Sequence, residues 1–129
     1  MNDRQESMKR NDTARLVRMS NRNRRNGVFF SKNELLAHKL AKCLVSIYLN
    51  SMDKEFITEA IFENKKRADI LILDDSVAVE IVCSEKEESI VRKRKDYPVD
   101  IIVLKATDVI VEFNKGIIKL MAFLDYKLN

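Results

Sequence analysis

Three short apolar segments, separated by two short polar connections, limit the folds open to this chain more than any other feature. The segments are residues 56–62 (FITEAIF), 68–73 (ADILIL) and 77–83 (VAVEIVC). Each is rich in β-branched residues and has the length of a β-strand. The connections, residues 63–67 and 74–76, are too short to carry the chain across a sheet for parallel pairing. We therefore expect a three-strand antiparallel meander.

A helix is predicted ahead of the meander. Ser31 and Glu34 have the spacing of a capping box, in which each side chain bonds the backbone N–H of the other residue. The apolar residues that follow recur every three or four positions, which predicts one buried helix face and a helix that continues to about Leu49. These residues are Leu36, Leu40, Cys43, Leu44 and Ile47.

The second half of the chain predicts two more helices around further strands. Residues 85–96 begin acidic and end basic, which matches the helix dipole. Residues 99–104 (VDIIVL) are continuously apolar and follow a helix, so we expect a buried strand parallel to its predecessor. Residues 109–113 suggest a short edge strand and residues 117–128 a C-terminal helix. The predicted class is α/β (α+β), in the order helix, antiparallel meander, helix, parallel strand and C-terminal helix.

Basic residues concentrate near the N-terminus. Residues 1–30 hold eight Lys or Arg and three Asp or Glu, whereas the 129 residues together carry +4. We interpret this segment as a basic mobile arm, either a solvated tail or a DNA-binding element, and residues 31–129 as one domain. The cations expected to contact DNA phosphates are Arg22, Arg24, Arg25, Arg92, Lys93, Arg94 and Lys95. The last four have a simpler alternative, a solvated helix end.

No stretch of the sequence approaches the ~20 apolar residues of a membrane span, and the first residues are too polar for a secretory signal. These features favour a cytoplasmic protein with no membrane partner. The two cysteines, Cys43 and Cys83, lie among apolar residues without metal-site spacing, so we expect buried, reduced thiols.

Three acidic residues interrupt the apolar strands. Glu59, Asp69 and Glu80 each lie within or at the start of a predicted strand, where an uncompensated carboxylate costs several kcal/mol. A hairpin closed at residues 74–76 places Asp69 and Glu80 on neighbouring strands, ~5 Å apart, where both can bind one Mg²⁺ or Mn²⁺ ion. The alternative is a salt bridge to Arg67 or to a lysine on a helix.

Another group of candidate residues lies on the first predicted helix. Glu34, His38 and Lys42 are spaced at four-residue intervals and therefore share one side of that helix. They can face the same site as the strand carboxylates. The simpler alternatives are a satisfied border position for His38, the single histidine, and a solvated helix flank for Lys42.

These elements, in this order, resemble the PD-(D/E)XK nuclease superfamily, the fold of many restriction endonucleases and archaeal Holliday-junction resolvases. The closer resemblance is to the nuclease-type domain of CoiA-like competence proteins. It rests on HKLAK (38–42), TEAIFENKKRADILI (58–72) and VAVEIVCSEKEESIVRKRKDYP (77–98). The pattern expected in that group is H-x-x-x-K on the helix, a strand Glu, R-A-D, then E-x-Q-C-S and a helix that ends in R-x-x-x-Y. The resemblance covers about residues 34–104 and implies a restriction-endonuclease-like core.

The resemblance implies site residues and an activity. Asp69 and Glu80 would bind Mg²⁺ or Mn²⁺, Glu59 or Glu34 would add a carboxylate, and His38 would lie near the scissile phosphate. The implied reaction is metal-dependent hydrolysis of DNA phosphodiesters. Because small nucleases that cut both strands commonly act as symmetric pairs, a homodimer is a further expectation.

One position departs from the family pattern. The family has Lys, or Gln in the CoiA-like group, two residues after the strand Glu, where this chain has Val82. Either another lysine replaces the missing group, with Lys42 as the first candidate and Lys39 as the second, or the site no longer cleaves. In the second case the chain is a nucleic-acid-binding or assembly module. A purely structural subunit is a third alternative.

Overall fold

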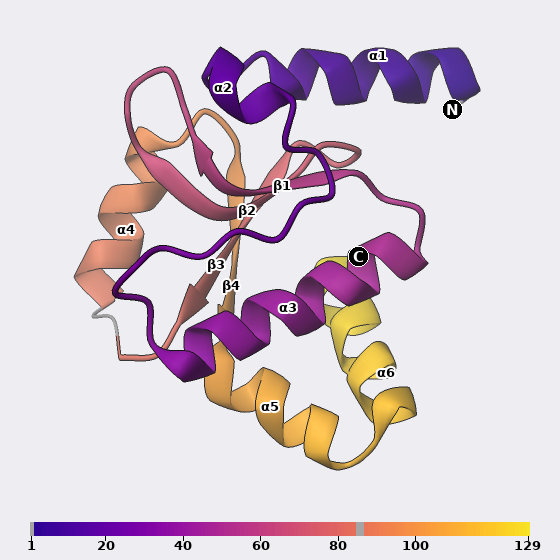
Figure 1. Cartoon of the computed structure of the whole chain (residues 1–129), viewed down its shortest axis with the longest axis vertical. Coiled ribbons are helices and arrows are strands. Elements are labelled where there is room, and N and C mark those ends of the chain that lie inside the picture. The colour runs from indigo at the N-terminus through magenta and orange to yellow at the C-terminus, as the bar shows by residue number, and fades with distance from the viewer. Residues whose placement is uncertain (1, 85–86) are drawn as a thin grey trace.

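The computed structural model describes residues 2–84 and 87–129 and has a mixed α/β architecture (Figure 1). The helices are α1 (Asp3–Ala14), α2 (Met19–Arg22), α3 (Leu36–Ser51), α4 (Glu87–Asp96), α5 (Ala106–Asn114) and α6 (Ile117–Leu128). The strands are β1 (Phe56–Ile61), β2 (Arg67–Ile72), β3 (Val77–Val82) and β4 (Asp100–Lys105). The C-terminal helix has its predicted bounds. The first predicted residues of α4, 85 and 86, lie outside the described residues.

The four strands form one sheet in the order β1-β2-β3-β4. β1 pairs antiparallel with β2, and β2 antiparallel with β3, which confirms the predicted meander. β4 pairs parallel with β3, as expected for a strand reached through a helix.

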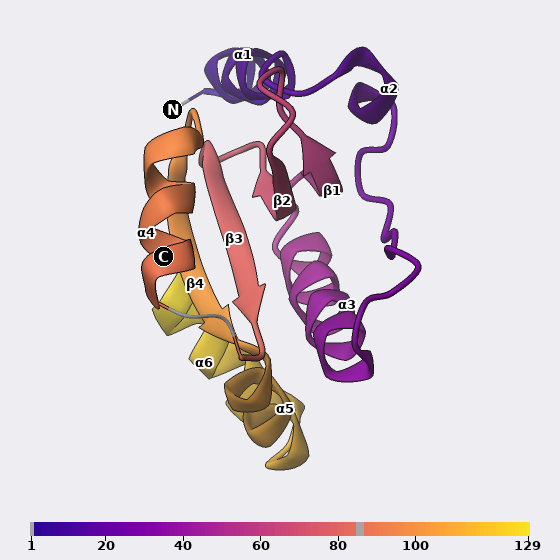
Figure 2. The ribbon, with the colours of Figure 1, turned by 90° about the vertical axis from the view of Figure 1, so that its left-hand side faces the viewer.

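Helices cover both faces of the sheet (Figures 1 and 2). On one face α3, α5 and α6 pack over side chains such as Ile70, Val79 and Ile81. On the other face, the end of α1 and the residue after α4 pack over side chains such as Leu71 and Ala78. The sheet is therefore the middle layer, with an apolar cluster on each side.

Helix α3 begins later than predicted and buries a different face. Its N-cap is Leu35, and Ser31 bonds Glu34 through its backbone N–H (3.0 Å) ahead of the helix. The predicted core stripe is wrong for several members: Leu36 is 80% exposed and Ile47 60% exposed. A second set with helical spacing forms the buried face instead: Ala41, Lys42, Leu44, Val45, Tyr48 and Leu49. Because α3 is apolar on two sides, periodicity alone does not select the buried one.

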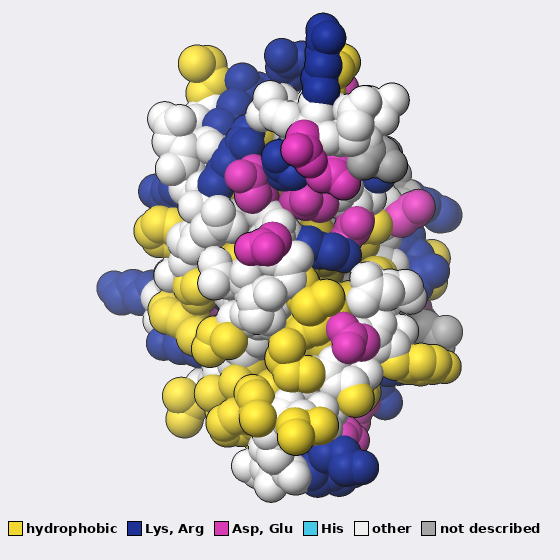
Figure 3. All heavy atoms as spheres, turned by 90° about the vertical axis from the view of Figure 1, so that its right-hand side faces the viewer, with side chains coloured by type: hydrophobic (Ala, Val, Ile, Leu, Met, Phe, Trp, Pro, Cys, Tyr) yellow, Lys and Arg dark blue, Asp and Glu magenta, His cyan; other side chains and the backbone are white. Residues whose placement is uncertain are grey.

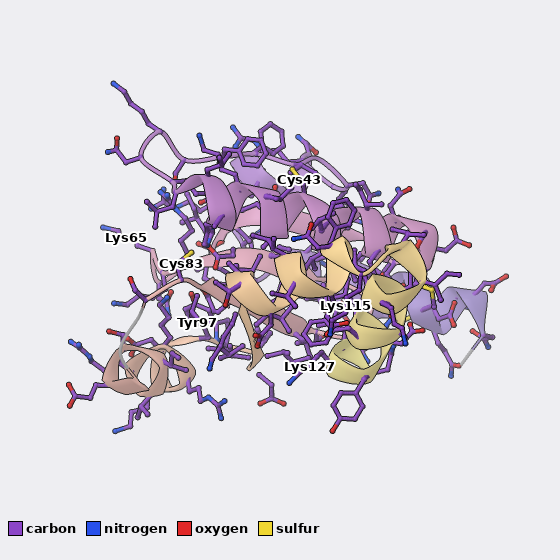
Figure 4. All side chains as sticks on the ribbon, turned by 90° about the horizontal axis from the view of Figure 1, so that it is seen from below. Cys43, Lys65, Cys83, Tyr97, Lys115 and Lys127 are labelled. Carbon is purple, nitrogen blue, oxygen red and sulfur yellow. The ribbon has the colours of Figure 1, made fainter. Side chains whose placement is uncertain are left out.

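The exposed side of α3 contributes to an apolar surface. Figure 3 shows apolar side chains over the lower half of one face of the molecule and charged side chains above them. In Figure 4, Cys43 projects from the side of α3 that faces away from α5 and α6. Cys43 is half-buried and Cys83 is exposed, so the expectation of two buried thiols is wrong.

Residues 109–113 are helical, which corrects the expected edge strand. They lie within α5, where Ala106 and Val109 are buried one helical turn apart. The β-branched residues of this segment suggested a strand, but α5 contacts both α3 and α6 as a helix, with Val109 buried and Val111 exposed.

Part of the N-terminal segment, which the sequence predicted to be a mobile arm, is in contact with the sheet. Val17 is fully buried against the meander. The backbone N–H of Arg18 donates to the Ile61 carbonyl (2.9 Å), and that of Asn26 donates to the Phe56 carbonyl (2.8 Å). Residues 18–26 therefore cover the outer edge of β1. No helix in the described part of the chain is long and apolar enough to cross a membrane.

Candidate functional site

The candidate site lies where β3 separates from β2. The two strands pair only between Ile70–Ile72 and Val77–Val79, whereas β3 continues beside β4 as far as Val82. At the point of separation, the Ile81 backbone N–H donates to Asp69 Oδ2 (2.8 Å). The Asp69 side chain thus takes the place of a strand partner and is held in the gap between the strands.

Asp69 and Glu80 form a hydrogen-bonded carboxyl pair in this gap. Burial and the neighbouring Asp69 charge raise the pKa of Glu80 to about 8. Burial alone would raise the pKa of Asp69, but hydrogen bonds from His38, Glu80 and Ile81 hold it below its usual value. The pair therefore shares one proton near neutral pH, with the proton on Glu80. The predicted proximity of the two residues is confirmed.

Glu80 has partners from α4 and from the residue that follows it. It is 2% exposed, and the Tyr97 hydroxyl contacts both Glu80 Oε1 and the Arg67 carbonyl. Lys93 Nζ lies 3.5 Å from Glu80 Oε2. Figure 4 shows Tyr97 between α4 and the sheet. Glu80 is thus held by Tyr97 and by Lys93 of α4, which is the salt bridge to a helix lysine that the sequence left open as the alternative; Arg67 contacts Tyr97 and Glu59 instead.

His38 connects the carboxyl pair to the start of α3. Its Nδ1 lies 2.6 Å from Glu34 Oε2 and its Nε2 lies 3.2 Å from Asp69 Oδ2. The hydrogen bond to Asp69, opposed by burial and helped by Glu34, raises the pKa of His38 to about 9. Burial would raise the pKa of Glu34, but Lys42, His38 and Ser31 together lower it. His38 is therefore an imidazolium that orients Asp69, and both of its nitrogens are occupied.

Lys42 is fully buried and bound by three acceptors. Its Nζ donates to Glu34 Oε1 (2.9 Å), Glu59 Oε1 (2.6 Å) and the Phe29 carbonyl (3.0 Å). Neither Asp69 nor Glu80 is among these partners. The structure places Lys42 beneath the site as a support, so it does not take the place of the lysine missing at Val82.

Glu59 lies opposite Asp69 across a local distortion of β1. It has a left-handed backbone (φ 51°), a conformation that costs a non-glycine residue about 1–2 kcal/mol. The β1–β2 pairing is interrupted there: Thr58 pairs with Ile70 and Ala60 with Ala68. The turned Glu59 carboxylate reaches Lys42 and lies 3.4 Å from Arg67 Nη1.

These residues line one side of an acidic pocket of about 330 Å³. Glu34, Glu59 and Asp69 contribute carboxylates, and His38 and Arg67 contribute positive charge. Within residues 2–84 and 87–129, no group of three or more His, Cys, Asp or Glu side chains is arranged to hold a metal ion. Asp69 and Glu80 offer carboxyl oxygens, the ligand type that hard divalent cations such as Mg²⁺ take in proteins.

The basic residues predicted to contact DNA have varied surroundings. Arg22 donates to the Val17 and Arg15 carbonyls, and Arg25 to Glu55 (3.0 Å) and Asn11 (3.1 Å). Arg24 stacks on the Phe29 ring at 4.7 Å. These three therefore help to fix the N-terminal segment. On α4, Arg92, Arg94 and Lys95 are exposed, and Lys93 contacts Glu80.

Reasoning from the residues alone missed Tyr97 and considered Arg67 only as an alternative salt-bridge partner for the strand carboxylates. Tyr97 contacts Glu80, and Arg67 lies between Glu59 and Tyr97. The signal for Arg67 in the sequence is the R-A-D motif. The signal for Tyr97 is the R-x-x-x-Y helix ending, whose spacing Lys93 and Tyr97 repeat with Lys in the first position.

Comparisons with known proteins found no match: no family model, curated protein or solved structure matches the chain.

The protonation of this site predicts that stability falls as the pH rises from about 4.5 to about 9. Glu80 and His38 bind their protons more tightly when folded, since their pKa values rise from 4.5 to about 8 and from 6.5 to about 9. A folded state that binds more protons loses stability with rising pH, by at most about 1.4 kcal/mol per pH unit for each group. The loss begins with Glu80 alone and is steepest where both groups titrate.

Urea unfolding at a series of pH values measures this effect. Glu80→Gln is the matched control, because its neutral amide replaces the protonated carboxyl and removes one of the two titrations. We expect a shallower decline for this variant. A free energy of unfolding that is flat from pH 6 to 9 in the unsubstituted chain would contradict the proposed protonation.

Proposed function

We propose that this chain is a metal-dependent DNA endonuclease of the PD-(D/E)XK type. The observation that carries the proposal is the buried Asp69–Glu80 carboxyl pair in the gap between β2 and β3, beside an acidic pocket. Such a pair is unfavourable unless a proton or a cation compensates its charge. Asp69 and Glu80 would hold Mg²⁺ or Mn²⁺, which when bound polarises a phosphodiester and lowers the pKa of a bound water.

The surrounding residues would orient this pair. His38, itself held by Glu34, fixes Asp69, and Tyr97 fixes Glu80. Glu34 and Glu59, which line the pocket, are both bound by the buried Lys42. Each of these contacts restrains a side chain before substrate arrives, which is how a site reduces the cost of organising its reacting groups.

Lys93 is the lysine that contacts the pair. The family pattern would place a lysine at Val82, on β3, but Val82 is apolar and buried. Lys93 reaches Glu80 from α4 instead (3.5 Å). We propose that Lys93 orients the attacking water, in place of the Lys42 and Lys39 candidates.

A second candidate function is a catalytically silent DNA-binding module on the same fold. Two observations favour it: Val82 occupies the position of the water-orienting residue, and three acceptors hold Lys42 in the interior. This module would bind DNA through its cations and would not need a metal ion.

Cleavage assays with matched lysine variants separate the two functions. Supercoiled plasmid and branched DNA are incubated with the full chain and Mg²⁺, Mn²⁺ or EDTA. We expect metal-dependent cleavage that Lys93→Gln lowers about a hundredfold, the scale of a lost proton-handling group. Lys119→Gln, the same change at an exposed position of α6 that lines neither the acidic pocket nor the pocket beside α4, is expected to leave the rate unchanged. Salt-sensitive binding without cleavage in either metal would contradict the nuclease proposal and support the silent module.

A further inference from the structure

A second pocket adjoins the acidic one and has the opposite charge. It measures about 260 Å³ and lies between α4 and the start of β2. Four cations line it, namely Lys66, Arg67, Arg92 and Lys93, and Asp96 contributes the one carboxylate in its lining. Arg67 lines both pockets, so the cationic pocket begins where the acidic pocket ends.

The spacing of residues on α4 builds one wall of this pocket. Ser89, Arg92, Lys93 and Asp96 follow the pattern i, i+3, i+4 and i+7, which gathers them on one side of the helix. Arg94 and Lys95 lie between them in sequence but do not line the pocket. The same helix therefore carries two kinds of cation, those that face the pocket and those that do not.

The contacts within the pocket leave an excess of positive charge. Lys66 Nζ lies 3.6 Å from Asp96 Oδ2, Arg67 is paired with Glu59 (3.4 Å), and Lys93 lies 3.5 Å from Glu80. The guanidinium groups of Arg67 and Arg92 offer planar, forked donors, and Ser89 adds a hydroxyl. This combination of donors is the one that recognises phosphate oxygens.

We propose that the cationic pocket is a phosphate-binding subsite for the DNA strand that enters the acidic pocket. The proposal rests on the proposed function for the identity of the polymer, whereas phosphate binding itself requires no metal. A phosphate held there positions the strand beside Asp69 and Glu80, since Arg67 borders both pockets. The ligand chemistry is a phosphate oxyanion, either a terminal monoester or an internal diester of the strand.

The subsite is tested by DNA binding in EDTA, where cleavage does not occur. Fluorescence anisotropy of the full chain is measured with one labelled duplex that carries either a 5′-phosphate or a 5′-hydroxyl. Arg92→Gln is expected to raise Kd about tenfold and to lower the salt slope by about one phosphate contact. The matched comparison is Arg94→Gln, which removes the same charge from the same helix outside the pocket; as a contact through diffuse charge it is expected to raise Kd clearly less than Arg92→Gln does.

The two DNA ends identify the source of the phosphate. If Arg92→Gln weakens binding only of the 5′-phosphorylated duplex, the pocket holds a terminal monoester. If it weakens both duplexes equally, the pocket holds an internal diester. Equal effects of Arg92→Gln and Arg94→Gln on Kd would overturn the subsite, because α4 would then contribute only diffuse charge. Absence of cleavage with an intact Arg92 effect would contradict the nuclease proposal alone.

Discussion

Asp69→Asn is expected to lower the rate of metal-dependent DNA cleavage by about a thousandfold or more. The metal supplies several kcal/mol of charge stabilisation in the transition state, and each ~1.4 kcal/mol is a factor of ten in rate. Asn retains an oxygen that accepts from the Ile81 N–H and from His38, two of the groups that now hold Asp69. It loses the negative charge that the cation requires. Plasmid nicking rates over a range of Mg²⁺ concentrations measure the effect.

A loss of cleavage by Asp69→Asn must be distinguished from a loss of folding. Circular dichroism and urea unfolding show whether Asp69→Asn remains folded, and Glu80→Gln provides a second neutral replacement in the same pair. Calorimetry with Mg²⁺ should show binding to the unsubstituted chain and none to either variant. Unchanged cleavage in both variants would reject the assignment of the site.

The largest expected loss of stability follows from Lys42→Met, at about 3–5 kcal/mol. Lys42 is 0% exposed and compensates two buried carboxylates, those of Glu34 and Glu59. Methionine fills a similar volume but removes the buried positive charge and one hydrogen-bond donor from each carboxylate and from the Phe29 carbonyl. Domains are commonly stable by only about 5–15 kcal/mol, so this loss is a large share of the total.

Urea denaturation followed by circular dichroism checks this value. The matched control is Lys39→Met, which removes a half-buried cation from the same helix near the Phe30 ring. We expect that control to cost less than about 1 kcal/mol, as is usual for a surface change. A cost for Lys42→Met as small as that of Lys39→Met would show that the buried ion network is not required for folding.

The parts of the fold that follow from local geometry were predictable. The short connection at residues 74–76 sets the register of the β2–β3 hairpin, and this register places Asp69 beside Glu80. Likewise, a strand reached through a helix is almost always parallel to its predecessor, as β4 is. Both predictions depend on a few neighbouring residues and on rules with few exceptions.

The parts that depend on tertiary contacts were not predictable. Helix α3 has apolar residues on two sides, and the buried side is the one on which Lys42 meets Glu34 and Glu59. No periodicity indicates that a lysine belongs to the interior. Similarly, Tyr97 contacts Glu80 only because α4 folds back over the sheet, so its role depends on contacts that are distant in sequence.

The N-terminal segment hydrogen-bonds to the edge of the sheet, and this limits how copies of the chain can associate. Residues 18–26 occupy the hydrogen-bonding edge of β1, and in the described part of the chain β4 pairs with β3 alone. A strand from another copy of the chain could therefore pair with the outer edge of β4. Two copies related by a twofold axis would then form one continuous sheet. Removal of the first 26 residues would open a second border and favour irregular self-association, because exposed strand edges template further pairing.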